Sequence, residues 1–211
     1  MKKLLLSTLL LVGTLGAAYS QVGARISLVM PRGDMGAVFK NALSYDVCYM
    51  LDRRKGRIRS TLGLSFTSLA PRADSFPTYQ DGAGNSGNGN SIMPELRVYK
   101  PMKNYAFYID NSFRIFSVQQ FSFYAGVRLT MGLSKSSYDT YAKYNSTSVD
   151  AGANDNYYGG LGASIQGVYT VGSHAQVCAF IGHNALVATD WSYNFSHHFL
   201  GLGLNYRIKG N

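Results

Sequence analysis

Apolar and polar residues alternate almost one by one along most of this chain. From Tyr105 to Ile115 the odd positions are aromatic or aliphatic except at Asn111, and in 121–133 every odd position is apolar. A period of two is typical of a strand with one apolar face, whereas a helix repeats every 3.6 residues. The pattern therefore predicts an all-β chain.

Further runs with the same alternation follow one another, separated by turn and loop residues. They lie at about 22–30, 42–51, 58–69, 92–100, 157–170, 175–187 and 197–208, with a weaker, more polar run at about 137–144. Together these give ten strands, and single-chain bacterial barrels close with an even number. We expect a transmembrane antiparallel up-and-down β-barrel of ten strands. Eight strands, with two of these runs merged or lost, is the alternative.

The segments between the runs are unequal in length. Short turns are predicted at 52–57, 101–104 and 171–174, and exposed polar loops are predicted at 31–41, 70–91, 145–156 and 188–196. Short turns at one end and long polar loops at the other are typical of outer-membrane barrels. Gly33-Asp34-Met35-Gly36 lies in the first loop, where we interpret it as a turn rather than a phosphate site.

The residues on the polar phase indicate whether the polar face of the strands points outward to solvent or inward to the lumen. A soluble barrel would expose Lys and Glu, yet only one Glu occurs, and the lysines after residue 20 fall in or near turns, loops or strand ends. The polar phase instead carries Gly, Ser, Thr and a few charges of both signs, which suits a narrow lumen where ions need partners. We predict a lumen charge network of Arg25, Asp46, Arg59, Glu95, Arg97, Asp110, Arg114, Arg128 and Arg207.

The first twenty residues have the features of a cleavable signal peptide. Lys2 and Lys3 precede an apolar stretch, and Ala18 and Ser20 place small residues before a cleavage point at Gln21. The apolar stretch is shorter than the roughly 20 residues of a membrane anchor. We expect residues 1–20 to be a signal peptide and residues 21–211 an outer-membrane barrel domain.

Four segments resemble small outer-membrane β-barrel proteins of the OmpX and OmpA-transmembrane-domain type. They are Ser27-Leu-Val-Met-Pro31 with the following Gly33–Gly36, Pro94-Glu-Leu-Arg-Val-Tyr99, and the closing Gly201-Leu-Gly-Leu-Asn-Tyr-Arg-Ile208. The resemblance covers nearly all of the mature chain. It implies contact with outer-membrane lipid and insertion by the barrel assembly machinery through the last strand. That family often ends on an aromatic residue, whereas five residues follow Tyr206 here.

The formal net charge of +9 raises the question of nucleic-acid binding. However, a basic group falls in predicted short turns, where anionic headgroups or a periplasmic partner explain it better. This group comprises Arg53, Arg54, Lys55, Arg57, Lys100 and Lys103. We therefore expect envelope or secretion proteins as partners, and no nucleic acid. The chain contains no phosphate-binding or dinucleotide-binding glycine motif, so no cofactor is expected.

Two cysteines, Cys48 and Cys178, would enter an oxidising compartment after export. A disulfide between them is allowed, but each lies inside a strand-like run. Two buried thiols are the alternative.

Reactive side chains gather near the last predicted loop. The group contains His183, Asn184, Thr189, Asp190, Trp191, Ser192, Ser196, His197 and His198. A rim acyl hydrolase is one interpretation, but lipid A deacylases carry a Ser two residues after the His, where this chain has Ala185. Adjacent His197 and His198 point to opposite faces of a strand and chelate poorly, so no metal site is predicted.

The predicted lumen charges allow two interpretations. They could line an ion path, or they could form salt bridges that fill a barrel too narrow for much beyond side chains. We interpret the chain as a non-enzymatic outer-membrane barrel with a structural or interaction role, and an accessory of a surface or secretion assembly is one form that such a role can take. A narrow pore for small solutes and a rim-located lipid acyl hydrolase are the alternatives.

Overall fold

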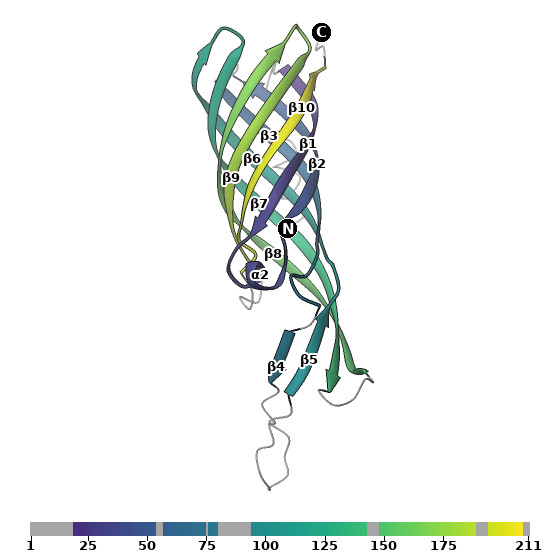
Figure 1. Ribbon diagram of the computed structural model, residues 1–211. Helices are drawn as coiled ribbons and strands as arrows, with labels where there is room; N and C mark the ends of the chain where they lie inside the picture. The colour runs from purple at the N-terminus through teal and green to yellow at the C-terminus, as the bar shows by residue number, and fades with distance from the viewer. Residues whose placement is uncertain are drawn as a thin grey trace, which may run out of the picture.

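Eight strands form a closed antiparallel barrel in the computed structural model, which describes residues 19–53, 57–74, 76–79, 94–142, 148–188 and 194–208 (Figure 1). The strands of the barrel are β1 (Tyr19–Pro31), β2 (Ala42–Arg53), β3 (Ile58–Leu69), β6 (Met102–Val118), β7 (Phe121–Ala142), β8 (Ser148–Val171), β9 (Ala175–Ala188) and β10 (His197–Arg207). Each pairs with the next in this order, and β10 pairs with β1 to close the ring. Closure leaves no free sheet edge within the ring.

A small sheet extends the structure beyond the barrel. The short strand β4 (Phe76–Tyr79) pairs with β5 (Pro94–Tyr99), and β5 pairs with the end of β7 over residues 138–142. The end of β7 pairs on its other edge with the start of β8. In Figure 1 this sheet projects away from the barrel at the end that carries the helix α2 (Gly33–Val38).

The expectation of ten strands in the barrel is wrong, and the alternative of eight is confirmed. The weak run at 137–144 begins within β7, which continues unbroken through it to Ala142. The run at 92–100 contains β5, which pairs with this continuation of β7 and not within the ring. Alternation identifies a strand, but it does not say whether that strand belongs to the barrel.

Short turns join neighbouring strands at one end of the barrel. They lie at Gln119–Gln120 between β6 and β7 and at 172–174 between β8 and β9, and at the same end β2 stops at Arg53 and β3 begins at Ile58. Gln119 has φ +51°, an unfavourable value for a residue with a side chain. The predicted turn at 101–104 is wrong, because β6 begins at Met102 and its short turn lies at its other end. Lys100 and Lys103 therefore lie at the long-loop end.

Three predicted loops at the long-loop end contain regular structure, and the predicted loop at 70–91 contains the strand β4. Gly33–Val38 forms the helix α2, where we expected only a turn, and Gly33 has φ +58°. The predicted loop at 145–156 is shortened, because β8 begins at Ser148. The helical residues among those described form no segment long and apolar enough to cross a membrane.

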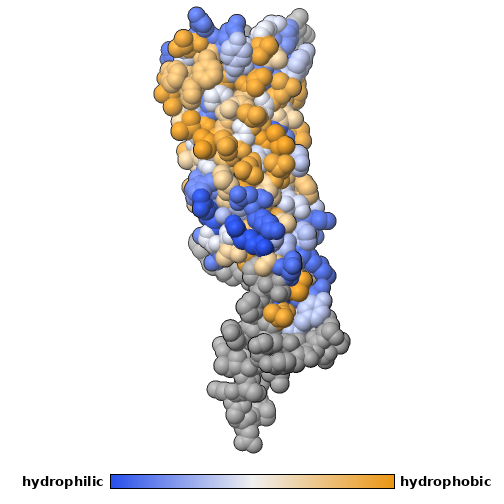
Figure 2. Space-filling model, viewed as in Figure 1, coloured by the Kyte–Doolittle hydropathy of each residue, from blue (hydrophilic) through white to orange (hydrophobic). Residues whose placement is uncertain are grey.

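The two faces of the barrel wall differ in chemistry as the alternation predicts. Outward side chains such as Val47, Leu64 and Leu202 are 60–69% exposed, whereas Gln21, Arg59 and Asn205 inside the barrel are fully buried. Figure 2 shows the outward apolar residues as a broad band, with a hydrophilic zone below it towards α2. This inside-out arrangement is suited to a lipid environment.

Candidate functional site

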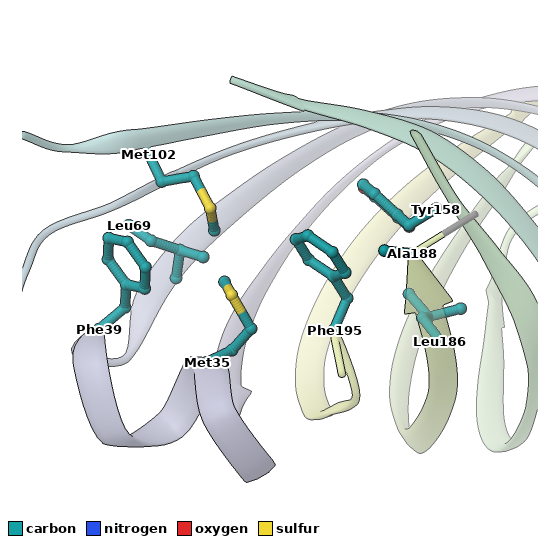
Figure 3. Packing of buried hydrophobic residues seen from close by; sticks show 8 residues of the cluster. All are labelled: Met35, Phe39, Leu69, Met102, Tyr158, Leu186, Ala188 and Phe195. Carbon is teal, nitrogen blue, oxygen red and sulfur yellow. The ribbon is translucent and has the colours of Figure 1, made fainter. Parts of the chain in front are cut away.

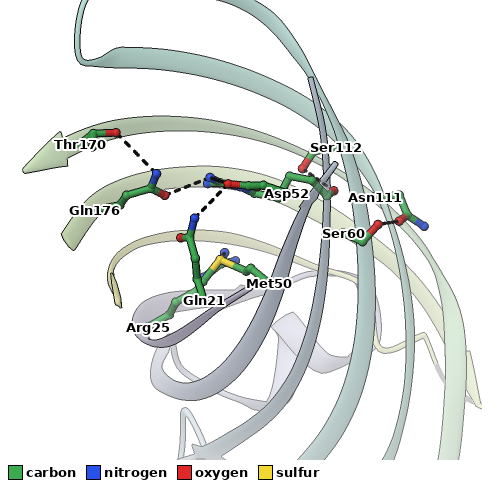
Figure 4. Close-up of polar contacts among 10 residues, drawn as sticks. Gln21, Arg25, Met50, Asp52, Ser60, Asn111, Ser112, Thr170 and Gln176 are labelled. Carbon is green, nitrogen blue, oxygen red and sulfur yellow. Dashed lines mark hydrogen bonds and ion pairs between the residues drawn. The ribbon is translucent and has the colours of Figure 1, made fainter. Parts of the chain in front are cut away.

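A hydrogen-bonded ion pair occupies the lumen near the short turns (Figure 4). Arg59 donates to both carboxylate oxygens of Asp52, from Nε at 2.7 Å and from Nη2 at 2.9 Å. Gln21 donates to the same carboxylate at 2.9 Å, and Arg59 also donates to Gln176 at 2.9 Å. The strands β1, β2, β3 and β9 thus contribute to one polar layer. Such a bidentate pair is among the stronger charge-assisted contacts in proteins.

A second ion pair lies deeper in the lumen. Arg128 donates from Nε and Nη2 to one carboxylate oxygen of Asp110, both at 3.2 Å, and Ser164 donates to that oxygen at 3.0 Å. The Arg128 guanidinium also lies 4.3 Å from the ring centre of Tyr108 and 4.5 Å from that of Phe199. An arginine held between two aromatic rings and a carboxylate has little room to move.

The three buried lumen arginines, Arg25, Arg59 and Arg128, all lie against aromatic rings. Arg59 lies 4.6 Å from the ring centre of Tyr124, and Arg25 lies 5.2 Å from that of Phe180. Cation–π contacts of this kind gain strength where water is excluded. The sequence contained a signal for these contacts that we missed. Tyr108 and Tyr124 lie on the polar phase of their strands, so their rings point into the lumen and not towards lipid.

The residues of the predicted lumen charge network do not all lie in the lumen. Arg25, Asp46, Arg59, Asp110 and Arg128 are buried in the lumen. Arg114 and Arg207 are half-buried on the lumen phase near the short turns. Glu95 and Arg97 are on β5, outside the ring, so their assignment to the lumen is wrong. Asp52, the partner of Arg59, was missed because it was assigned to a turn, although β2 continues to Arg53.

Both cysteines are buried inside the barrel as free thiols. Cys48 donates weakly to the backbone oxygen of Gly23 at 3.6 Å, and Cys178 is 1% exposed. The structure thus matches the alternative of two buried thiols.

An apolar cluster covers the long-loop mouth of the barrel (Figure 3). Met35 and Phe39 come from the segment around α2, and Phe195 comes from the chain leading into β10. They meet side chains that β3, β6, β8 and β9 direct inward, and Phe195 stacks on Tyr158 with ring centres 5.0 Å apart. We call this cluster the apolar cap: Met35, Phe39, Leu69, Met102, Tyr158, Leu186, Ala188 and Phe195.

A cavity of about 60 Å³ lies between the apolar cap and the ion pair of Arg128 and Asp110. Its walls include Met35 and Phe195 of the cap, the charged side chains of Asp46 and Arg128, and His197. The volume is enough for a few water molecules. Buried side chains lie on both sides of this cavity.

The predicted reactive cluster near the last loop is divided by the structure. Thr189, Asp190, Trp191 and Ser192 lie outside the described residues. His197 turns inward, where its Nε2 accepts from Asn184 at 3.0 Å and its Nδ1 donates to the backbone oxygen of Phe195 at 3.2 Å. Ser196 Oγ accepts from the backbone N–H of Leu186 at 3.2 Å. These contacts use both His197 nitrogens structurally and do not join Ser196 to a histidine base.

A cleft of about 120 Å³ lies where the projecting sheet meets the barrel mouth. Tyr138 lines this cleft, and its ring centre lies 4.8 Å from the Arg97 guanidinium and 5.8 Å from the centre of the Tyr99 ring. Arg97 Nε is buried and has no hydrogen-bond partner among the residues that the structure describes. We call this the sheet cleft, lined by Asp34, Phe39, Arg97, Tyr99, Ser136, Tyr138, Asn154 and Asn156 among others.

The sheet cleft combines the features of a binding site. Aromatic faces supply apolar contact area, while a cation, a carboxylate and two amides offer directional hydrogen bonds. Sequence reasoning missed it because its residues come from segments that are far apart in the sequence. The pairing of β7 with β5 and with β8 brings several of them together, and Asp34, Phe39 and Phe195 come from other parts of the chain.

Comparison with known proteins reveals similarity in fold. No protein-family model matches the chain, and no curated protein matches it in sequence. Among solved structures, Neisserial surface protein A aligns with a TM-score of 0.58 at 14% identity, over 91% of this chain and 99% of that one. A major outer membrane protein from Thermus thermophilus aligns with a TM-score of 0.50 at 12% identity, over 90% and 99%.

A third structure, the attachment invasion locus protein Ail of Yersinia pestis, aligns with a TM-score of 0.47 at 13% identity, over 90% of this chain and 97% of that one. The first two similarities carry the conclusion. This chain has the fold of the small outer-membrane β-barrels of the OmpA and OmpX type.

Proposed function

We propose that this protein is a non-enzymatic barrel of the outer membrane that binds a partner through its projecting sheet and sheet cleft. One contrast carries the proposal: the lumen is filled by ion pairs and an apolar cap, whereas β7 and β8 extend beyond the barrel and form a shaped, partly aromatic surface. A role as an accessory of a surface or secretion assembly is consistent with such a surface.

Site-specific crosslinking tests this proposal. A photo-crosslinking residue replacing Ser136 would sit in the sheet cleft, and the same residue replacing Val127 would sit on the lipid-facing wall. We expect a discrete adduct from position 136 that is absent from position 127 and weakened by Tyr138→Ala. The proposal fails if position 136 gives no specific adduct and deletion of the protein leaves the envelope unchanged.

Placement in the outer membrane is a separate part of the proposal. The apolar outer band suits lipid contact, residues 1–20 would act as a signal peptide, and the barrel assembly machinery would insert the chain. A closed barrel that resists detergent runs faster on a gel before boiling than after it. A faster unboiled band in the outer-membrane fraction is expected, and a soluble protein without that shift would contradict this placement.

A narrow pore is the second candidate, because polar and charged side chains line the lumen beneath the apolar cap. Planar-bilayer recording tests it directly. Steady conductance that changes in Arg128→Ala would favour the pore, whereas silence of the folded protein would remove it.

A lipid acyl hydrolase at the rim is less well supported, because His197 and Ser196 are engaged in structural hydrogen bonds. Lipid A acylation that stays unchanged after loss of the protein would eliminate this function.

A further inference from the structure

Two histidines face each other on the outside of the barrel near its long-loop end. His183 on β9 and His198 on β10 are direct partners in the antiparallel register. Their Nδ1 atoms are 3.2 Å apart, and their ring centres are 4.7 Å apart. His183 is exposed and His198 is half-buried. This pair joins residues 15 positions apart in the sequence, unlike the adjacent pair His197 and His198.

The histidine pair lies at the border of the apolar band. Two residues further along each strand, Ile181 pairs with Leu200, and both are about half exposed on the outer wall. His183 and His198 therefore form the first polar pair beyond this apolar contact. In Figure 2 a hydrophilic zone lies below the apolar band on the face that shows β1, β9 and β10.

The spacing of the two nitrogens matches that of adjacent ligands on one metal ion. Zinc–nitrogen bonds are about 2.0–2.1 Å long. Two nitrogens 3.2 Å apart therefore subtend an angle of about 100° at a shared ion with such bonds, close to the tetrahedral value. Imidazole nitrogen suits zinc, copper and nickel, and it suits calcium and magnesium poorly.

We propose that His183 and His198 form a binding site for a divalent transition-metal ion of the zinc class at the outer surface of the barrel. Each ring supplies Nδ1 as a ligand and keeps its proton on Nε2. The described residues contain no cluster of three or more His, Cys, Asp and Glu side chains, so water completes the coordination. The pair replaces its own hydrogen bond with two metal–nitrogen bonds.

Arg32 carries a positive charge that acts on His198, so it opposes the binding of a metal cation at this site. Removal of that charge should strengthen metal binding, whereas two histidines joined only by a hydrogen bond would show no such response. Arg32→Gln is therefore a discriminating variant, and its side chain is exposed.

Zinc titration of the tag-free, folded protein in detergent tests the site. We expect one ion to bind, with affinity reduced by at least about tenfold in His183→Ala and in His198→Ala, because even mutations around metal ligands cause losses of this size. His174→Ala is the matched control, since His174 lies at the short-turn end beside Tyr206. Arg32→Gln should bind more tightly than the wild type.

Copper binding gives a second, spectroscopic measurement. The electron paramagnetic resonance spectrum should show two coordinating nitrogens in the wild type and one in each single variant. The unboiled gel band verifies that every variant is folded, and His→Gln replacements are available if an alanine variant does not fold. The proposal is overturned if the wild type coordinates through one nitrogen, if only one of the two histidines matters, or if His174→Ala is equally impaired.

Discussion

The two ends of the lumen are closed by different chemistry. Near the short turns, Asp52 and Arg59 are buried and paired within the barrel wall, so strand register alone brings them together. At the long-loop mouth, Met35, Phe39 and Phe195 arrive from segments that fold back over the opening. The first closure is built into the wall, whereas the second depends on loops whose positions register does not determine.

Loss of one charge at the short-turn end should have the largest effect. Arg59→Ala leaves the Asp52 carboxylate buried without its ion-pair partner, which typically costs about 3–5 kcal/mol. Urea unfolding in detergent or lipid should show this fall in the free energy of unfolding. Replacement of both residues by apolar ones of similar size should restore much of it, and equal instability of the double variant would contradict the explanation.

Loss of one ring at the opposite end should cost slightly less. Phe195→Ala removes the ring stacked on Tyr158, and a buried Phe→Ala change costs about 3–5 kcal/mol in a rigid core. We expect the lower end of this range, because the cap segments can collapse into the space. The same unfolding experiment measures it, with exposed Phe113→Ala on the outer wall as the control. An equal fall in the free energy of unfolding for Phe195→Ala and Phe113→Ala would mean that packing in the apolar cap does not stabilise the barrel more than an outward-facing ring does.

The wall between the two ends is sensitive to added volume. A Cβ at Gly63 would lie 2.2 Å from a ring atom of Tyr108, so the ring, which packs against Arg128, would have to move. Gly63→Ala should therefore cost about 1–3 kcal/mol. Gly167→Ala is the control, since its nearest contact would be 3.3 Å away at the edge of the Phe121 ring. Similar stability of the two variants would show that Tyr108 is free to move.

An exposed ion pair at the barrel rim, where β7 and β8 leave the ring, should matter least. Lys135 and Asp155 are 3.2 Å apart, but both side chains are more than half exposed. Lys135→Ala should change the free energy of unfolding by less than about 1 kcal/mol. A fall in the free energy of unfolding as large as that of Arg59→Ala would imply that this exposed pair contributes strongly to the stability of the barrel.

Alternation alone predicted much of the barrel, because the apolar and polar positions of each strand show which side chains face outward and which face the lumen. Val127 and Arg128 show this, as the first is exposed outside and the second is buried inside. The number of strands in the ring could not be predicted from the alternation. Residues 137–142 alternate like a separate strand, but they are the end of β7 and pair with β5 outside the ring. The turn at Gln119–Gln120 lacks the Gly or Pro that usually marks a turn.

The candidate sites were less predictable than the wall, because they depend on partners that are distant in the sequence. Arg59 was identified, yet its partner Asp52 was assigned to a turn. His198 was weighed against its neighbour His197, but the register pairs it with His183 on another strand. The apolar cap combines residues from Met35 to Phe195, and their contacts depend on how two loops fold back.

The pairing of β1 with β10 also determines when the molecule can finish folding. Gln21 lies opposite Arg207, so the ring closes through contact between the first and the last of the described strands. Contacts of such long sequence separation form slowly, because chain entropy must be lost before they give any gain. Until the last strand arrives, both open edges could pair with other chains. The growing sheet therefore needs shelter from aggregation for as long as its final eleven-residue strand is still undocked.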